Sequence, residues 1–160
     1  MTHIYKLITS FIVFISVILL FCSCNKSNTT KPKLEDALYR LDSSITQEQL
    51  IDLMRSEPNS SDNDSLEYMN KLVWNISSNA ITFNFQNNHL KSIFMYLYDT
   101  DLIDAELVYT DLQIQYGESE LKALDNGLKM TYWIINDNKD TVSYSRNEDG
   151  SVLGVTFIFK

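Results

Sequence analysis

The sequence predicts an α+β fold of two tandem repeats, each made of helix plus an antiparallel three-stranded meander. Three observations lead to this prediction. Helical periodicity occurs twice along the chain, alternating apolar and polar runs follow it each time, and the two halves share a spacing. Glu57 lies 17 residues before Trp74, and Tyr116 lies 17 residues before Trp133. The alternative to a duplication is that chains of helices and meanders show such spacing by chance.

The first repeat is expected at residues 34–98. Apolar residues recur with helical spacing between positions 34 and 41, which predicts a short amphipathic helix. A second helix is expected after Thr46, because Gln49 stands where a capping box needs it, and Pro58 is expected to end that helix. Three strands are then expected, at residues 72–76, 81–86 and 90–98.

The second repeat is expected at residues 99–160. Asp101 can cap a helix that runs to Tyr116 and is followed by Gly117. A strand competes with this helix, because residues 108–116 also alternate, but the acidic first turn and the terminal glycine favour the helix. Further strands are expected at residues 129–136, 141–146 and 152–159.

Short polar motifs are expected to connect the strands. Asn87-Asn88 tolerates positive φ and suits a hairpin turn, and Asp149-Gly150 is the strongest hairpin signal in the chain. Residues 59–65 are expected to form a polar loop.

The N-terminal residues have the features of a secretory signal. The apolar run from Leu7 to Cys22 follows Lys6 and is shorter than the roughly 20 residues that span a bilayer. We therefore expect residues 1–23 to be a signal peptide and residues 24–33 to be a polar tether.

The end of this apolar run reads Phe21-Cys22-Ser23-Cys24, which resembles the lipobox of bacterial lipoproteins. A small residue precedes the lipidated cysteine in that motif, so the resemblance implies cleavage after Ser23 and lipid attachment to Cys24. The alternatives are a signal peptide with an unmodified cysteine, or an uncleaved anchor. Asn25 stands where some bacteria place a retention aspartate, so resemblance to their sorting rules implies the outer membrane, with the protein facing the periplasm.

The composition argues against several partners. Lys6 is the only charged residue among residues 1–23, so residues 24–160 keep 12 basic and 21 acidic residues, a formal net charge of −9. Nucleic-acid binding depends on basic residues that neutralise phosphates, so no nucleic acid is expected as a partner. Attraction to anionic lipid is disfavoured for the same reason, which leaves the lipid on Cys24 as the expected membrane contact.

A family resemblance rests on the helix from Thr46 to Pro58, on Trp74, and on the hairpin through Phe83 and Phe85. Together with the lipobox, this pattern resembles the group of small envelope lipoproteins related to the β-lactamase inhibitor protein and to the small lipoprotein of the outer-membrane assembly machine. The resemblance covers most of residues 34–160 and implies a non-catalytic binding module.

The residues that common catalytic and metal sites need are scarce. Beyond the signal peptide the chain has one histidine, His89, and one cysteine, the expected lipid site, so neither a zinc site nor a Ser-His-Asp triad is expected. The glycines do not form a phosphate loop, and residues 62–64 begin like a calcium loop without completing it. No cofactor is therefore expected, and carboxylate pairs are the one catalytic option left.

A stripe of aromatic residues gives the main functional hypothesis. Phe94, Tyr96 and Tyr98 share one face of an expected strand, and such side chains often anchor protein interfaces. We therefore expect an envelope module that binds a protein or peptide through this stripe. The alternatives are that another part of the chain covers the stripe as core, that the protein carries a small ligand or glycan, or that it is an acid-pair hydrolase.

Overall fold

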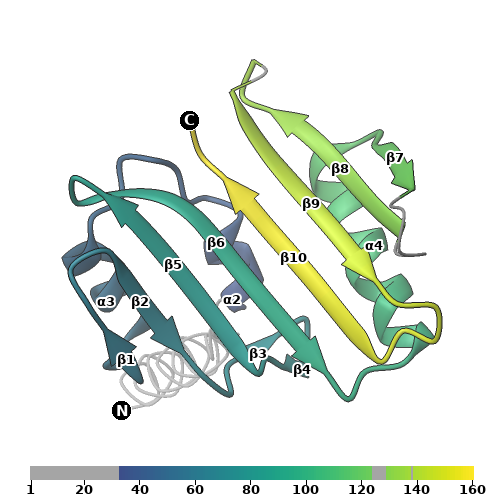
Figure 1. Cartoon of the computed structure of the whole chain (residues 1–160), viewed down its shortest axis with the longest axis horizontal. Helices are drawn as coiled ribbons and strands as arrows, with labels where there is room; N and C mark the ends of the chain where they lie inside the picture. The colour runs from purple at the N-terminus through teal and green to yellow at the C-terminus, as the bar shows by residue number, and fades with distance from the viewer. Residues whose placement is uncertain (1–32, 124–128, 138) are drawn as a thin grey trace, which may run out of the picture. The chain divides into compact units, whose positions relative to one another are not determined.

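The computed structural model describes residues 33–123, 129–137 and 139–160, so the expected signal peptide and most of the expected tether lie outside the described residues. Lys33–Lys160 forms one compact unit (Figure 1). Its helices are α2 (Leu34–Leu38), α3 (Gln47–Met54) and α4 (Leu102–Tyr116). Its strands are β1 (Ser60–Ser61), β2 (Ser65–Tyr68), β3 (Leu72–Val73), β4 (Ile76–Ser77), β5 (Ala80–Gln86), β6 (His89–Tyr98), β7 (Glu120–Ala123), β8 (Lys129–Ile135), β9 (Asp140–Arg146) and β10 (Val152–Ile158). Among the described residues, no helix has the length and apolar character needed to cross a bilayer.

Eight of the strands form one antiparallel sheet in the order β1-β2-β5-β6-β10-β9-β8-β7, and β3 and β4 form a separate hairpin. The fold is therefore mostly β, and the predicted α+β fold of tandem helix-plus-meander repeats is wrong. The decisive pairing joins β6 to β10, from Tyr98 opposite Val152 to Ser92 opposite Ile158. Without this pairing, β6 and β10 would each have one edge of unpaired backbone N–H and C=O groups. The pairing provides hydrogen-bond partners for both edges and joins the strands into one continuous sheet.

The two tryptophans lie on unrelated elements, which removes the basis for a duplication. Trp133 is in β8 of the large sheet, whereas Trp74 and Asn75 form the turn of the β3–β4 hairpin, with φ of 53° and 62°. The strand expected at residues 72–76 is therefore wrong. The sequence prediction placed Trp74 in a strand on the alternation of apolar residues alone. A bulky residue at positive φ is uncommon because its Cβ crowds the backbone, so a turn was not expected at this position.

Local capping signals are confirmed in two helices. The Thr46 hydroxyl accepts a hydrogen bond from the Gln49 N–H at 3.3 Å, and the Gln49 side chain accepts one from the Thr46 N–H at 3.0 Å, which completes the capping box of α3. The Asp101 carboxylate accepts hydrogen bonds from two N–H groups of the first turn of α4, at 2.7 and 2.9 Å. Gly117 follows α4 with φ of 80°, so the helical interpretation is confirmed over the strand.

Turn chemistry is also confirmed at the β5–β6 hairpin, where Asn87 and Asn88 have φ of 52° and 60°. Gly150, between β9 and β10, has φ of 75°, and a Cβ there would lie 2.7 Å from the Asp101 carbonyl oxygen. Only glycine fits this turn without strain. The polar loop expected at residues 59–65 is partly wrong, because β1 lies within it and β2 begins at its end.

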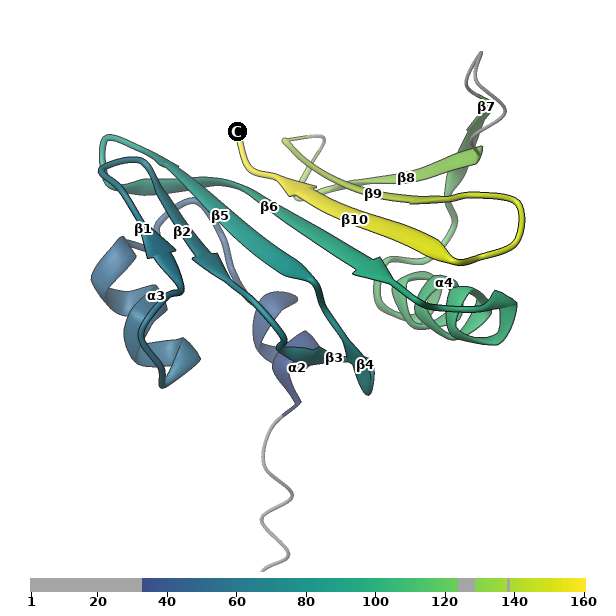
Figure 2. The ribbon, with the colours of Figure 1, turned by 60° about the horizontal axis from the view of Figure 1, so that its bottom comes forward.

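The helices α2, α3 and α4 all lie on one side of the large sheet (Figure 2). Buried side chains between the sheet and the helices form the core, which includes Leu66, Tyr68, Ile81, Phe83, Ile93, Met95, Leu97, Leu153, Val155, Phe157, Val142, Tyr144 and Trp133 from strands and Leu38, Leu50, Ala105, Val108 and Leu112 from helices. No described helix lies over the opposite side of the sheet. We call that side the open face.

Candidate functional site

The central part of the open face is formed by the outward residues of five strands, which alternate with the buried ones. They are Ala80, Thr82 and Asn84 of β5, Ser92, Phe94, Tyr96 and Tyr98 of β6, Val152, Gly154, Thr156 and Ile158 of β10, Thr141, Ser143 and Ser145 of β9, and Met130, Tyr132 and Ile134 of β8. None of these residues is charged, whereas Glu67 of β2, opposite Thr82, and Glu120 of β7, opposite Tyr132, place carboxylates toward the two edges of the same face. The central strands thus combine aromatic and aliphatic side chains with Ser, Thr and Asn and no charged side chain, and charged residues are depleted at the centres of protein interfaces.

The aromatic stripe predicted from the sequence lies on this open face. Tyr96 and Tyr98 are each 45% exposed, and Phe94 is half-buried. The expectation that another part of the chain covers the stripe is therefore wrong for the two tyrosines. Tyr132, Ile134 and Ile158 extend the partly exposed apolar surface across β8 and β10, which sequence reasoning missed because these strands are distant in the chain.

Tyr96 stands above small neighbours. Its direct cross-strand partners are Ala80 on β5 and Gly154 on β10. The space above Gly154 is limited by the next strand, because a Cβ there would lie 2.8 Å from the Ser145 hydroxyl oxygen. The Ser145 side chain therefore occupies the space that a side chain at position 154 would need, as expected where a glycine lets a neighbouring group approach a strand closely.

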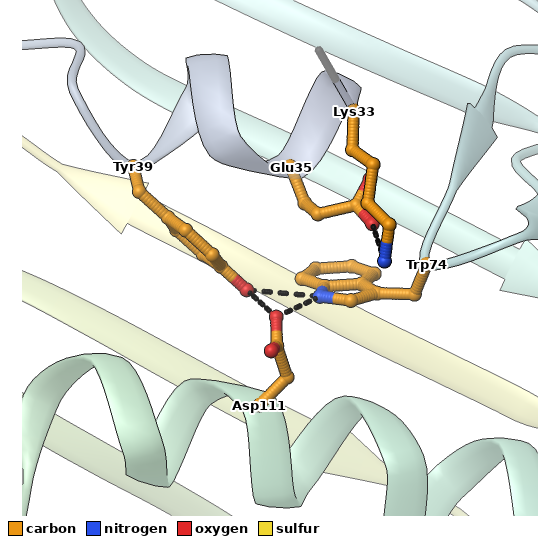
Figure 3. A network of polar contacts seen from close by, with 5 residues as sticks. All are labelled: Lys33, Glu35, Tyr39, Trp74 and Asp111. Atoms are coloured by element: carbon orange, nitrogen blue, oxygen red, sulfur yellow. Dashed lines mark hydrogen bonds and ion pairs between the residues drawn. The ribbon is translucent and has the colours of Figure 1, made fainter. Parts of the chain in front are cut away.

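A second group of side chains lies on the helix side and forms a polar network (Figure 3). The Asp111 carboxylate oxygen Oδ2 accepts a hydrogen bond from the Tyr39 hydroxyl at 2.5 Å and one from the Trp74 indole N–H at 2.8 Å. The same indole N–H lies 2.9 Å from the Tyr39 hydroxyl oxygen. Tyr39 caps the C-terminus of α2, Asp111 is in α4 and Trp74 is in the β3–β4 turn, so the network connects these elements.

The network also accounts for the conformation of Trp74. Its backbone has positive φ, yet the side chain is only 3% exposed and its single donor is satisfied. Burial and the hydrogen bonds offset the backbone strain, which typically costs about 1–3 kcal/mol. Burial raises the pKa of Tyr39 far above its usual range, and the hydrogen bond to Asp111 raises that pKa further. Tyr39 therefore remains a neutral hydrogen-bond donor.

Aromatic packing continues from this network toward the sheet. The Tyr39 ring meets Tyr116 edge-on at 5.8 Å between centroids, and Tyr116 lies 6.4 Å from Trp133. The Tyr109 ring then contacts both Trp133, at 6.1 Å, and Tyr144, at 5.8 Å. Edge and tilted contacts of this kind stabilise a core beyond the burial of area alone. These rings are structural contacts between α2, α4, β8 and β9.

A cleft of about 500 Å³ lies beside the network. It is lined by Lys33, Glu35, Asp36, Trp74, Asn75, Glu106, Leu107, Thr110, Asp111 and Ile114. Its lining includes four carboxylates and one ammonium group, and the Lys33 ammonium lies 3.8 Å from the Glu35 carboxylate (Figure 3). This acidic cleft differs from the closed apolar cavity that a carrier of apolar ligands needs.

The structure also shows the positions of the other residues that the sequence analysis considered for catalysis or metal binding. His89 is exposed at the start of β6 beside the hairpin turn. The Asp62 carboxylate accepts hydrogen bonds from the Asp64 and Ser65 N–H groups, at 2.8 and 2.7 Å, so it organises its own loop. Among the described residues, no group of three or more histidine, cysteine or acidic side chains is arranged to hold a metal ion.

The sequence contained no signal for the polar network, because Tyr39 and Asp111 are 72 positions apart and Trp74 is 37 positions from Asp111. Cys24, the expected lipid site, lies outside the described residues. In the comparisons with known proteins, no protein-family model, no curated protein and no solved structure matches this chain. The resemblance to small envelope lipoproteins therefore stays a prediction from the sequence.

Proposed function

We propose that this protein is a lipid-anchored, non-catalytic module of the bacterial cell envelope that binds another protein through its open face. The observation that carries the proposal is the exposure of Tyr96 and Tyr98 on a central strand of the open face, with the carboxylates of Glu67 and Glu120 only toward its edges. Solvent-exposed sheet faces usually carry polar residues, as this one does at Thr82, Asn84 and Ser92, so the adjoining exposed aromatic side chains are the part of the face that suggests a contact surface.

The exposed rings can supply a useful part of a binding energy. A tyrosine with about 200 Å² of surface that is 45% exposed offers about 90 Å² for burial, which is worth about 2 kcal/mol at roughly 25 cal/mol per Å². Two such rings, Tyr96 and Tyr98, therefore have the size of interface hot spots. The rigid sheet holds them in place, so little conformational entropy is lost on binding.

The proposed anchor gives the module its location. A diacylated Cys24 would hold the body on a membrane through the ten residues of the tether at positions 24–33, and the signal peptide would direct it to the envelope. Two acyl chains are sufficient for stable anchoring, whereas a single chain gives only reversible binding.

The proposal can be tested by replacing Tyr96 and Tyr98 together with alanine in a full chain that carries a tag after Lys160. Proteins that co-purify from cross-linked envelopes are compared between the wild type and this variant. We expect the captured protein to bind at least about 100-fold more weakly, because two rings of about 2 kcal/mol each are lost. Thermal unfolding should change by less than about 10 °C, since both rings are already half exposed.

The matched control replaces Ile103 and Ile114 with alanine. These residues are 77% and 79% exposed on α4, on the helix side of the sheet. This control should keep the captured protein. Equal capture by the two double variants, or unfolding of the tyrosine variant, would show that the aromatic stripe is not the binding surface.

A further inference from the structure

We propose that a pocket between α4 and the β7–β9 end of the sheet binds a small α-amino acid, with Arg146 holding its carboxylate and Glu106 its ammonium group. The pocket has a volume of about 160 Å³ and is lined by Glu106, Tyr109, Leu121, Thr131, Tyr144 and Arg146. It lies on the helix side of the sheet, opposite the open face, so this inference goes beyond the proposed function and does not depend on it.

The walls of the pocket come from one row of sheet residues and one face of α4. Leu121 of β7 pairs with Thr131 of β8, and Thr131 pairs with Tyr144 of β9, so the three residues lie side by side. Glu106 and Tyr109 are three positions apart on α4 and therefore lie on the same face of that helix. The Tyr109 and Tyr144 rings are 5.8 Å apart between centroids, which joins α4 to the sheet at the pocket (Figure 1). The pocket is therefore held by packed elements.

The two charged groups that line the pocket do not pair with each other. Lys33 and Glu35 form the one ion pair among the described residues, so the Arg146 guanidinium and the Glu106 carboxylate are too far apart for such a contact. The Arg146 Nη1 donates hydrogen bonds to the carbonyl oxygens of Asn147 and Glu148, both at 3.4 Å, which is long for such bonds. A guanidinium has five N–H donors, so most of those of Arg146 have no partner within the described part of the chain.

Both charges act on the tyrosine that forms the buried wall of the pocket. Burial raises the pKa of Tyr144 to about 12, the Arg146 guanidinium lowers this pKa, and the Glu106 carboxylate raises it. Each charge is therefore close to the Tyr144 phenol. The phenol itself is 4% exposed and donates its hydrogen bond to the Ala105 carbonyl oxygen at 2.9 Å, so its donor is already used. Arg146 and Glu106 remain as the charged groups that a ligand can contact.

A ligand that carries both charges fits this arrangement better than a ligand that carries one. The planar guanidinium of Arg146 suits a carboxylate, to which it can donate two parallel hydrogen bonds. The Glu106 carboxylate can accept a hydrogen bond from an ammonium group, which the faces of the Tyr109 and Tyr144 rings also attract. The chain has a formal net charge of −8 and repels a simple carboxylate at long range, whereas an amino acid has no net charge.

The volume of the pocket limits the size of the ligand. At roughly 30 Å³ per water molecule, the pocket holds about five waters, which is close to the size of glycine or alanine. Thr131 is 7% exposed and adds a hydroxyl group to the lining. Leu121 is 71% exposed, so the pocket reaches solvent beside β7 and a small ligand can enter without a change of fold.

The test measures the binding of glycine and of both enantiomers of alanine to the full-length chain in detergent, by isothermal titration calorimetry. Propionate and ethylamine are the matched control ligands, because each lacks one of the two charged groups of alanine. We expect glycine or alanine to bind. Propionate and ethylamine should bind at least about tenfold more weakly, since each loses one charge-assisted contact. This comparison needs only the wild-type chain.

Two substitutions then locate the site. Arg146→Gln and Glu106→Gln should each weaken the binding of the amino acid at least about tenfold. Arg40→Gln is the control, because it changes an exposed arginine that does not line the pocket, and it should leave the affinity unchanged. Thermal unfolding of each variant checks that the fold is kept.

Three results would overturn the inference. The first is that neither glycine nor either enantiomer of alanine binds. The second is that propionate or ethylamine binds as tightly as the amino acid, since one charge would then be sufficient. The third is that binding survives either substitution in a folded variant, which would place the amino acid elsewhere on the chain. None of these results changes the expected capture of a protein through Tyr96 and Tyr98, which is measured separately.

Discussion

Replacing Asp111 with asparagine should lower the free energy of unfolding by about 2–3 kcal/mol. The carboxylate oxygen Oδ2 accepts hydrogen bonds from the Tyr39 hydroxyl at 2.5 Å and the Trp74 indole at 2.8 Å. Hydrogen bonds to a charged group contribute about 1.5–3 kcal/mol each, roughly twice the value for neutral pairs. The amide keeps an acceptor oxygen, so we expect about half of the combined contribution to be lost.

The strain at Trp74 makes this network more important than its distances alone indicate. The indole is 3% exposed and its backbone has φ of 53°, a conformation that costs about 1–3 kcal/mol in general. If Asp111 accepts the hydrogen bond from the Trp74 indole less well, one of the interactions that offset the backbone strain in the β3–β4 turn is weakened. The effect should therefore lie at the upper end of the range rather than at the lower end.

The assay is urea unfolding of a secreted form that begins at Asn25, followed by the fluorescence of the two buried tryptophans. Glu106→Gln is the matched control, because it makes the same acid-to-amide change on α4 at an exposed position. It should change the free energy of unfolding by no more than about 0.5 kcal/mol. If Asp111→Asn is no more destabilising than Glu106→Gln, the network does not stabilise the contact of α2 and the hairpin with α4.

Three further predictions concern other parts of the chain. Cys24→Ser should remove incorporation of a fatty-acid analogue and release the protein from the membrane or leave it unprocessed, whereas Cys22→Ser should do neither; label that persists on the Cys24 variant would contradict the lipid assignment. Thr46→Ala removes the hydroxyl of the capping box and should lower stability by about 1 kcal/mol in thermal unfolding, and no change would mean that the box is dispensable. Burial raises the pKa of Tyr144 from 10.0 to about 12. Because the unfolded chain releases this proton at lower pH, its contribution to stability is complete below pH 10 and is lost as the pH rises to about 12. Tyr144→Phe should therefore make stability fall less steeply in that window, by about 1.4 kcal/mol per pH unit, and an unchanged slope would contradict the raised pKa.

Local structure could be predicted where a few neighbouring residues decide it. The capping box at Thr46, the cap at Asp101 and the positive φ of Asn87 and Asn88 all depend on contacts within a few positions. The alternation of β5, β9 and β10 was also readable, because period-2 burial appears directly in the order of residues. All three described helices and five of the ten described strands were therefore found from the sequence.

The arrangement of the strands could not be predicted in this way. The pairing of β6 with β10 joins residues more than 50 positions apart, from Tyr98 opposite Val152 onward, and no local pattern encodes which edges meet. Trp74 shows the same limit, because its place in a turn depends on hydrogen bonds to Tyr39 and Asp111. These long-range contacts replaced the expected repeats with one continuous sheet.

The same distinction between local and long-range information applies to the candidate site. The sequence by itself determined that Phe94, Tyr96 and Tyr98 share one face of a strand, because successive side chains point to opposite sides. Only the tertiary structure decided that this face is open, that Gly154 lies beside Tyr96, and that the helices cover the opposite side. Alternation determines which side chains share a face, but burial depends on which elements pack against that face, and that packing is set by the whole fold.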